Sequence, residues 1–216
     1  MIYDCFLFHN ESMLLEIRMN TLKDVVDKFV LVESTHTFSG EPKDLHYDGI
    51  KNVAPFAEFK SRIIHAIHDS QPGDNRWLNQ TEQRNAIALG LRQAEPEDII
   101  LISDVDEIPN PDIFAVIRKQ KQPARLIQKL YYYFFNCQCE EDWYKAVFCR
   151  YKDFRGADSM RIDPEINRGA RNGGWHFSYL MEPEKIAQKI SILSQLFTAR
   201  IRHRLLHRCG KDSALC

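Results

Sequence analysis

The feature that most constrains the fold is a short, wholly apolar run followed at once by acidic residues. Residues 99–102 are Ile-Ile-Leu-Ile, and residues 103–107 are Ser-Asp-Val-Asp-Glu. A β-branched run of this length is typical of a parallel strand covered on both faces. Ligands of open α/β sheets bind beyond the carboxyl ends of such strands. The sequence therefore predicts an α/β fold whose chemistry lies at residues 104–107.

Shorter signals along the chain complete this sheet. Residues 3–8, 28–32 and 62–67 have the composition of strands, and a helical stripe of apolar residues follows the first of them. A second helix is expected from Asn79 or Thr81 to about Gln93, and a third over residues 112–119. With 216 residues, the chain suits one domain, a mostly parallel central sheet with flanking helices.

Charge and targeting signals exclude several classes of protein. The net charge of −1 and the pI of about 6.7 give no basic footprint, so no nucleic-acid partner is expected. The first residues lack the basic lead of a signal peptide, and no apolar run reaches the roughly 18 residues of a membrane span. We therefore expect a cytoplasmic protein. Six cysteines without Cys-x-x-Cys spacing give no support to a zinc site.

Asp104 and Asp106 are the candidate centre of the chemistry. If the backbone stays extended there, both carboxylates point to one side while Val105 packs on the other. A divalent cation would relieve their repulsion, and hard oxygen ligands favour magnesium or manganese. Such an ion could hold the diphosphate of a nucleotide-sugar donor. The alternative is that the aspartates only cap the turn at Pro109 and Pro111.

Residues 98–109, Asp-Ile-Ile-Leu-Ile-Ser-Asp-Val-Asp-Glu-Ile-Pro, resemble the corresponding motif of glycosyltransferase family 17. This family adds the bisecting N-acetylglucosamine to N-glycans. The likeness extends to residues 1–8, 10–11, 14–18, 25–33, 37–40, 83–87 and 173–180. It covers the chain from its first residue to about residue 190. The specificity of these motifs makes chance similarity a poor explanation.

The resemblance implies a GT-A-like fold and an inverting transfer from UDP-N-acetylglucosamine, β-1,4 to mannose of a glycan acceptor. It also implies manganese, or magnesium, at Asp104 and Asp106. The donor-binding residues carried over by position are Phe8, Asn10, Glu11, Glu33, Arg84, Asn85 and Trp175. Among them Arg84 would lie near the diphosphate, which its planar guanidinium suits.

Other residues leave two interpretations open. His176 could be a further metal ligand or a satisfied core histidine. The general base that takes the acceptor proton is not singled out: Glu107 lies beside the aspartates and enters the predicted catalytic set with them, while Asp163, Glu165 and Glu182 are the later candidates. Residues 169–174 form a basic, glycine-rich segment that could close over a diphosphate.

The aromatic run at residues 131–135 is expected to be a buried strand. The alternative is that one or two of its rings, with Trp175, form a platform for sugar rings.

The family likeness ends near residue 190, so we predict a glycosyltransferase domain over residues 1–190 and a divergent helical tail over residues 191–216. From residue 183 onward there are seven basic and two acidic residues. An amphipathic helix with this charge could touch an anionic membrane, or dock on the domain. Two other functions stay open: a metal-dependent phosphohydrolase, or a weakly active or non-catalytic nucleotide-sugar or glycan-binding module with a degenerate C-terminus.

Overall fold

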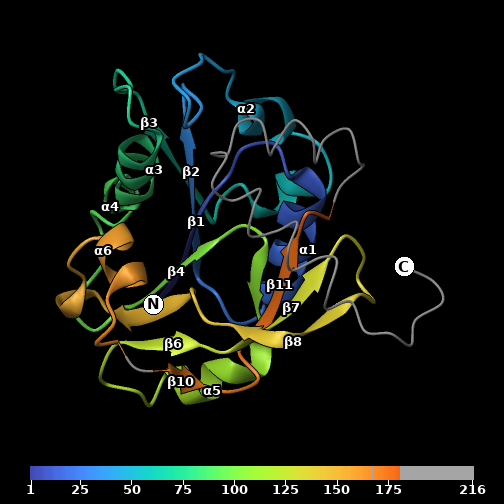
Figure 1. Ribbon diagram of the computed structural model, residues 1–216, viewed down its shortest axis with the longest axis vertical. Coiled ribbons are helices and arrows are strands. Elements are labelled where there is room, and N and C mark those ends of the chain that lie inside the picture. The colour runs from blue at the N-terminus through green and yellow to red at the C-terminus, as the bar shows by residue number, and fades with distance from the viewer. Residues whose placement is uncertain (167, 181–216) are drawn as a thin grey trace.

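A seven-stranded sheet forms the centre of the computed structural model, which describes residues 1–166 and 168–180 (Figure 1). Its strand order is β10-β6-β9-β4-β1-β2-β3. The bounds are β1 Ile2–Leu7, β2 Lys28–Ser34, β3 Ile63–His68, β4 Ile99–Asp104, β6 Ala124–Leu126, β9 Val147–Arg150 and β10 Arg168–Ala170. Strands β4, β1, β2 and β3 run parallel, and β9 runs antiparallel to both β4 and β6.

Strand β4 lies inside the sheet, as its apolar run predicts. It pairs in parallel with β1, from Ile2 opposite Ile99 to Leu7 opposite Asp104. Its other neighbour, β9, is antiparallel, so the sheet is mostly rather than wholly parallel. The predicted α/β class, with a mostly parallel central sheet and flanking helices, is confirmed.

A second, four-stranded sheet has the order β5-β11-β7-β8. Its strands are β5 Glu107–Pro109, β7 Gln128–Tyr132, β8 Gln138–Trp143 and β11 Gly174–Ser178. Only the turn at Val105 and Asp106 separates the end of β4 from the start of β5. The two sheets therefore meet at the acidic cluster that the sequence singles out.

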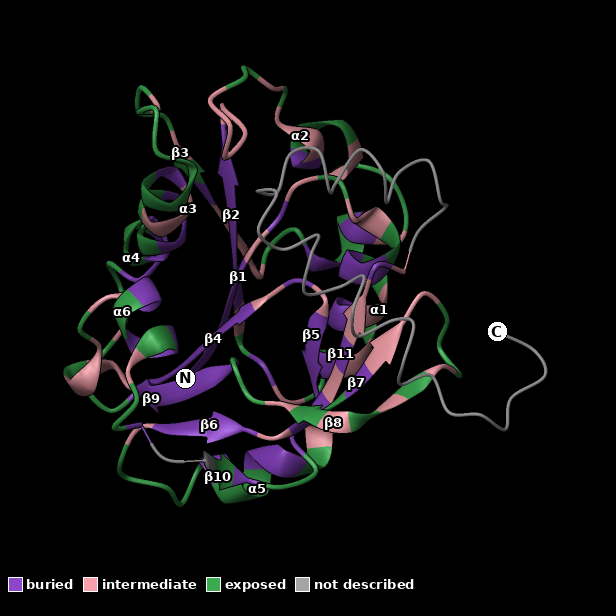
Figure 2. Cartoon of the chain, in the orientation of Figure 1, coloured by how far each residue is buried: buried purple, intermediate pink, exposed green. Residues whose placement is uncertain are grey.

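Helices cover the two faces of the large sheet. The α-helices are α1 Ser12–Leu22, α2 His46–Ile50, α3 Arg76–Asn85, α4 Ile87–Gly90, α5 Phe114–Ile117 and α6 Ala157–Ile162. The 3-10 turns are η1 Phe56–Phe59, η2 Pro111–Ile113 and η3 Tyr151–Asp153. Alternate strand residues enter two cores: Leu31 and Leu101 pack towards α1, whereas Val30 and Ile100 pack towards α4 and α6. Figure 2 shows the central strands buried between these layers.

The helix predicted to start at Asn79 or Thr81 begins earlier. Asn75 caps α3, because its side-chain oxygen accepts the backbone N–H groups of Trp77 and Leu78. Asn79 is instead buried inside the helix and holds the preceding loop. The helix predicted over residues 112–119 is shorter, consisting of η2 followed by α5.

The predictions for the aromatic run and for the glycine-rich segment also differ from the structure. Tyr131 and Tyr132 end β7 half-buried, and Phe134 and Phe135 beyond it are 61% and 49% exposed. The run is therefore a strand only in its first half, and the prediction that it is buried is wrong. The glycine-rich segment 169–174 is not a free closing loop. Gly174, with φ +123°, packs so tightly that a Cβ atom there would lie 2.1 Å from the carbonyl oxygen of Ile108.

In the part of the chain that the structure describes, no helix is both long enough and apolar enough to span a bilayer. The tail predicted over residues 191–216, with its helical character and its membrane contact, lies outside the described residues, as does Glu182. The domain boundary at residue 190 stays a prediction.

Candidate active site

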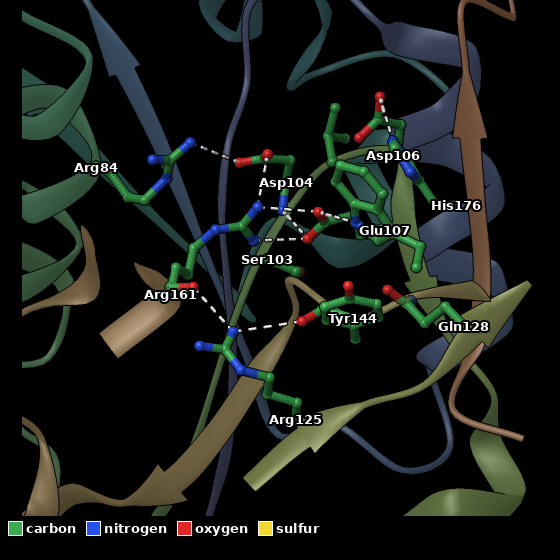
Figure 3. A network of polar contacts seen from close by, with 12 residues as sticks. Arg84, Ser103, Asp104, Asp106, Glu107, Arg125, Gln128, Tyr144, Arg161 and His176 are labelled. Atoms are coloured by element: carbon green, nitrogen blue, oxygen red, sulfur yellow. Dashed lines mark hydrogen bonds and ion pairs between the residues drawn. The ribbon is translucent and has the colours of Figure 1, made fainter. Parts of the chain in front are cut away.

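The β4–β5 turn carries the acidic side chains of the site. Asp104 ends β4, and its side chain is 34% exposed, while Val105 is buried and the Asp106 side chain is 13% exposed. The backbone turns at Val105 and Asp106 instead of staying extended, so the expectation of an extended segment is wrong. As Figure 3 shows, the two carboxylates consequently meet different partners.

Two arginines hold Asp104. Arg84, from α3, approaches its Oδ1 at 3.3 Å, and Arg161, from α6, donates to its Oδ2 at 2.9 Å. Partial burial opposes ionisation of this carboxyl, but the charges of Arg161 and Arg84 lower the pKa of Asp104 below its ordinary value. Asp104 is therefore anionic at neutral pH.

Glu107 lies behind this pair and is fully buried. Its carboxylate accepts two hydrogen bonds from Arg161, at 2.6 and 2.9 Å. It also accepts the backbone N–H of Asp104 at 2.9 Å and the indole N–H of Trp143 at 2.6 Å. Burial disfavours a charged guanidinium, yet Asp104 and Glu107 together raise the pKa of Arg161. A carboxylate with four donors and no exposed edge is badly placed as a general base, so its geometry indicates a positioning role.

Asp106 faces His176, which lies on β11. The imidazole Nε2 is 3.6 Å from the Asp106 Oδ2, and the indole of Trp143 packs on the imidazole with ring centroids 4.3 Å apart. Burial opposes protonation of His176, but Asp106, Glu107 and Asp104 outweigh it and raise the pKa of this histidine. The antiparallel pairing of β11 with β5 places His176 opposite Glu107 and so beside the turn.

The three predicted metal ligands are not gathered at one point. Asp104 is occupied by arginines, and in residues 1–166 and 168–180 no group of three or more histidine, cysteine or acidic side chains could hold a metal ion. Asp106 and His176, however, lie within reach of a single ion. Magnesium-type sites commonly use one or two protein ligands and take the rest from substrate phosphates and water. These two residues therefore fit a divalent cation, and Asp104 does not.

Arg18 supports the turn from behind, and sequence reasoning missed it. This α1 side chain is fully buried, pairs with the buried Asp4 and donates to the Ser103 hydroxyl. Its Nη1 donates to the backbone carbonyl oxygens of Asp104, Val105 and Glu107, at 3.0, 3.3 and 2.9 Å. The sequence did contain a signal, since Arg18 lies in the apolar stripe of the first helix. A charged side chain is rarely buried unless it is paired, so an arginine at such a position indicates a buried partner.

The predicted nucleotide-pocket residues lie at the same edge of the sheet, but mostly point inward. The residue before Phe8, Leu7, pairs with Asp104, which brings the end of β1 beside the acidic turn. Phe8 itself is in the core, and Asn10 is exposed. The Glu11 carboxylate accepts the backbone N–H groups of residues 9 and 10, both at 3.1 Å, and so shapes the β1–α1 turn.

Glu33 is also a structural support. Its buried carboxylate accepts the backbone N–H groups of His46 and Tyr47, at 2.8 and 3.1 Å, and lies 2.9 Å from the His65 Nε2. These contacts fix the start of α2. The geometry gives Glu33 an indirect role in any nucleotide site at this edge.

Arg84 and Asn85 are both tied to Asp158, at the start of α6. Arg84 forms an ion pair with the Asp158 carboxylate, and the Asn85 side-chain oxygen accepts the Asp158 backbone N–H at 3.1 Å. Among buried side-chain atoms in the described part of the chain, Arg84 Nε is one of three without a hydrogen-bond partner. Buried polar atoms are almost always paired, so this donor is suited to an anionic ligand.

The remaining predicted residues stay outside the network. Trp175 directly precedes His176 in β11, so its side chain faces the opposite side of that sheet. The Asp163 carboxylate pairs with Arg155, and Glu165 is exposed. None of these residues is brought to the acidic turn by the fold.

Comparison with known proteins identifies the class of molecule that this fold and site belong to. The family model described as "Glycosyltransferase family 17" matches residues 1–207. The chain belongs to glycosyltransferase family 17, and the resemblance predicted from its motifs is confirmed.

Individual relatives share one name. Beta-1,4-mannosyl-glycoprotein 4-beta-N-acetylglucosaminyltransferase of Homo sapiens is 32% identical over 218 residues, covering 84% of this chain and 41% of the relative. The proteins of that name from Rattus norvegicus and Mus musculus are 32% and 31% identical, each with 84% of this chain and 40% of the relative covered. The chain thus spans about two fifths of the length of these relatives.

Among solved structures, 2-C-methyl-D-erythritol 4-phosphate cytidylyltransferase of Francisella tularensis aligns with 89% of this chain and 99% of its own. The TM-score is 0.38 and the identity 9%, a likeness too weak to support any statement on function.

Proposed function

We propose that the chain is a GT-A-type glycosyltransferase that transfers N-acetylglucosamine from UDP-N-acetylglucosamine to a glycan acceptor, with inversion. The observation that carries the proposal is the polar network at the carboxyl end of β4, in a chain that belongs to family 17. The donor sugar and the β-1,4-mannose acceptor are suggested by the names of the relatives.

The cationic side of the network suits the diphosphate of the donor. Arg84 has an unpartnered Nε, and Arg161 lies beside it on Asp104. Burial and the positive charges of Arg125, Arg161 and Arg84 lower the pKa of the Lys145 amine. Positive groups that are already in place stabilise the negative charge that develops on a departing nucleotide.

Asp106 and His176 would hold the divalent cation, manganese or magnesium. When bound, such an ion would neutralise charge on the leaving diphosphate. The protein's own part is positioning: Arg18 fixes the carbonyl groups of the turn, and Glu107 fixes Arg161. Preorganised geometry of this kind lowers the barrier because little has to rearrange during the reaction.

The test is an assay with manganese and a panel of UDP-sugars, in which UDP release and sugar incorporation into added glycans are both followed. Transfer from UDP-N-acetylglucosamine is expected, and chelation of the metal should abolish it. Asp106→Asn should lower turnover by about a hundredfold or more. The matched control Asp24→Asn, at an exposed position, should have no effect.

Other outcomes would contradict the proposal. Phosphate release that does not depend on the sugar would indicate a phosphohydrolase. Donor binding without turnover would indicate a binding module. Full activity of Asp106→Asn would remove the metal argument.

A further inference from the structure

Three tyrosines pack together beside the candidate metal pair. Tyr132 ends β7, Tyr133 follows it, and Tyr179 follows β11. The ring centroids lie 6.0 Å apart for Tyr132 and Tyr133, 6.4 Å for Tyr132 and Tyr179, and 6.3 Å for Tyr133 and Tyr179. We call Tyr132, Tyr133 and Tyr179 the tyrosine triad.

The triad adjoins the acidic turn through β11. The backbone N–H of Phe177 donates to the carbonyl oxygen of Asp106 at 2.9 Å, directly after His176. Burial, with smaller effects of Tyr133 and Asp106, raises the pKa of Tyr179 to about 12. The Tyr179 hydroxyl therefore stays neutral at physiological pH.

Two members of the triad have an unusual backbone conformation. Tyr133 has φ +62° and Tyr179 has φ +56°, in the left-handed region that bulky residues rarely adopt. A hydrogen bond from the Tyr133 N–H to the Ser178 carbonyl oxygen, 3.1 Å long, links the two segments. Conformations of this cost are found mostly where a ligand or a catalytic group must be held in place.

The two segments that carry the triad contain no charged residue of their own. Residues 130–136 and 177–180 contain no acidic or basic side chain. Phe134 follows Tyr133 in the chain and is 61% exposed. The arginines, by contrast, lie on the Asp104 side of the turn, as Figure 3 shows. The charged side suits an anionic donor, and the neutral aromatic side suits a neutral, polyhydroxylated ring.

We propose that the tyrosine triad is the acceptor subsite and binds the face of a pyranose ring of a neutral glycan. The proposal rests on the proposed function and adds the position of the second substrate to it. Apolar ring faces would cover the carbon skeleton of the sugar, while phenol hydroxyls donate to or accept from its hydroxyl groups. The triad would then place the acceptor next to Asp106 and His176, where the donor is cleaved.

Tyr133 is the member to test, since it is half-buried whereas Tyr179 is buried. Tyr133→Gly removes the ring and suits the left-handed backbone, and Tyr133→Phe keeps the ring. Tyr151→Ala is the matched control: Tyr151 is also half-buried and ring-stacked, on Phe154, but lies beyond the opposite end of β4. The measurements are the KM for the glycan acceptor and the calorimetric Kd for UDP-N-acetylglucosamine with manganese.

Tyr133→Gly should raise the acceptor KM about tenfold, and Tyr133→Phe by less than about threefold, with the donor Kd unchanged in both. Tyr151→Ala should alter neither constant. An unchanged acceptor KM in Tyr133→Gly, or an equal weakening of donor binding in that variant, would overturn the acceptor subsite. A wild-type chain that binds no donor and releases no UDP would instead overturn the proposed function.

Discussion

Replacing Glu107 with glutamine distinguishes a buried support from a general base. The Oε1 atom accepts from Trp143 and Arg161, and the Oε2 atom accepts from Asp104 and Arg161. Whichever oxygen becomes an amide nitrogen, two donors lose their acceptor, and one of them belongs to a charged arginine. Unsatisfied buried donors cost about 1–3 kcal/mol each, and breaking a buried ion pair about 3–5 kcal/mol.

Asp104 still neutralises part of the Arg161 charge, so we expect the lower end of that range, a loss of about 3 kcal/mol in the free energy of unfolding. For a domain of this size, each kcal/mol lowers Tm by roughly 2–4 °C, which gives a drop of about 6–12 °C. Thermal unfolding followed by circular dichroism measures it. Glu97→Gln, which breaks only an exposed pair with Lys152, is the matched control and should leave Tm almost unchanged.

At a temperature well below Tm, the Glu107→Gln variant should keep measurable transfer activity. An unchanged Tm combined with complete loss of turnover would refute this reasoning. It would mean that Glu107, one of the candidates that the sequence leaves open, acts on the acceptor proton.

Three further predictions concern other parts of the molecule. Arg18→Lys keeps one charge for Asp4 but loses the planar fork that binds the carbonyl groups of the turn, so chemical denaturation should show a loss of about 3 kcal/mol or more. Burial raises the pKa of the Cys149 thiol from 9.0 to about 12, so the folded state holds this proton more tightly than the unfolded state does. The contribution of this group to stability is therefore full below about pH 9 and falls as the pH rises towards 12. Urea midpoints measured across that range should decline less steeply in Cys149→Ala. Gly174→Ala forces a Cβ atom against the Ile108 carbonyl at a φ of +123°, and should cost about 3 kcal/mol or more in the same unfolding assay.

The parts of the fold that follow from local composition could be predicted. Strands β1, β2 and β4 are buried apolar runs, and burial on both faces leaves a continuous pattern that sequence shows directly. The start of α3 could not be predicted, because several polar residues in this region can cap a helix. In the structure the Asn79 side chain binds the preceding loop and Asn75 is the residue that caps the helix. Helix propensity alone does not show which of several capping residues the tertiary packing will favour.

The features of the site likewise fall into those that local sequence predicts and those that depend on tertiary contacts. The position of Asp104 at a strand end follows from the sequence. So does the fact that the motif resembling glycosyltransferase family 17 includes this strand end. The partner of Asp104 on α6, Arg161, is 57 residues away, and nothing in local sequence indicates which arginine will arrive there. Asp104 and Asp106 were expected to point to the same side because the backbone was expected to stay extended. The turn at Val105 and Asp106, which local sequence does not reveal, gives the two carboxylates different neighbours instead.

The junction of the two sheets at the β4–β5 turn separates the residues that hold Asp104 from the tyrosine triad. Residues of α3 and α6 over the large sheet hold Asp104, whereas the tyrosine triad belongs to the small sheet and its hairpin. If the triad binds the acceptor as proposed, substitutions in the turn between β7 and β8 would alter which glycan is accepted and leave Arg84 and Arg161 in place. Exchange of this turn alone would then be a route to a new acceptor preference with the same proposed donor-binding residues.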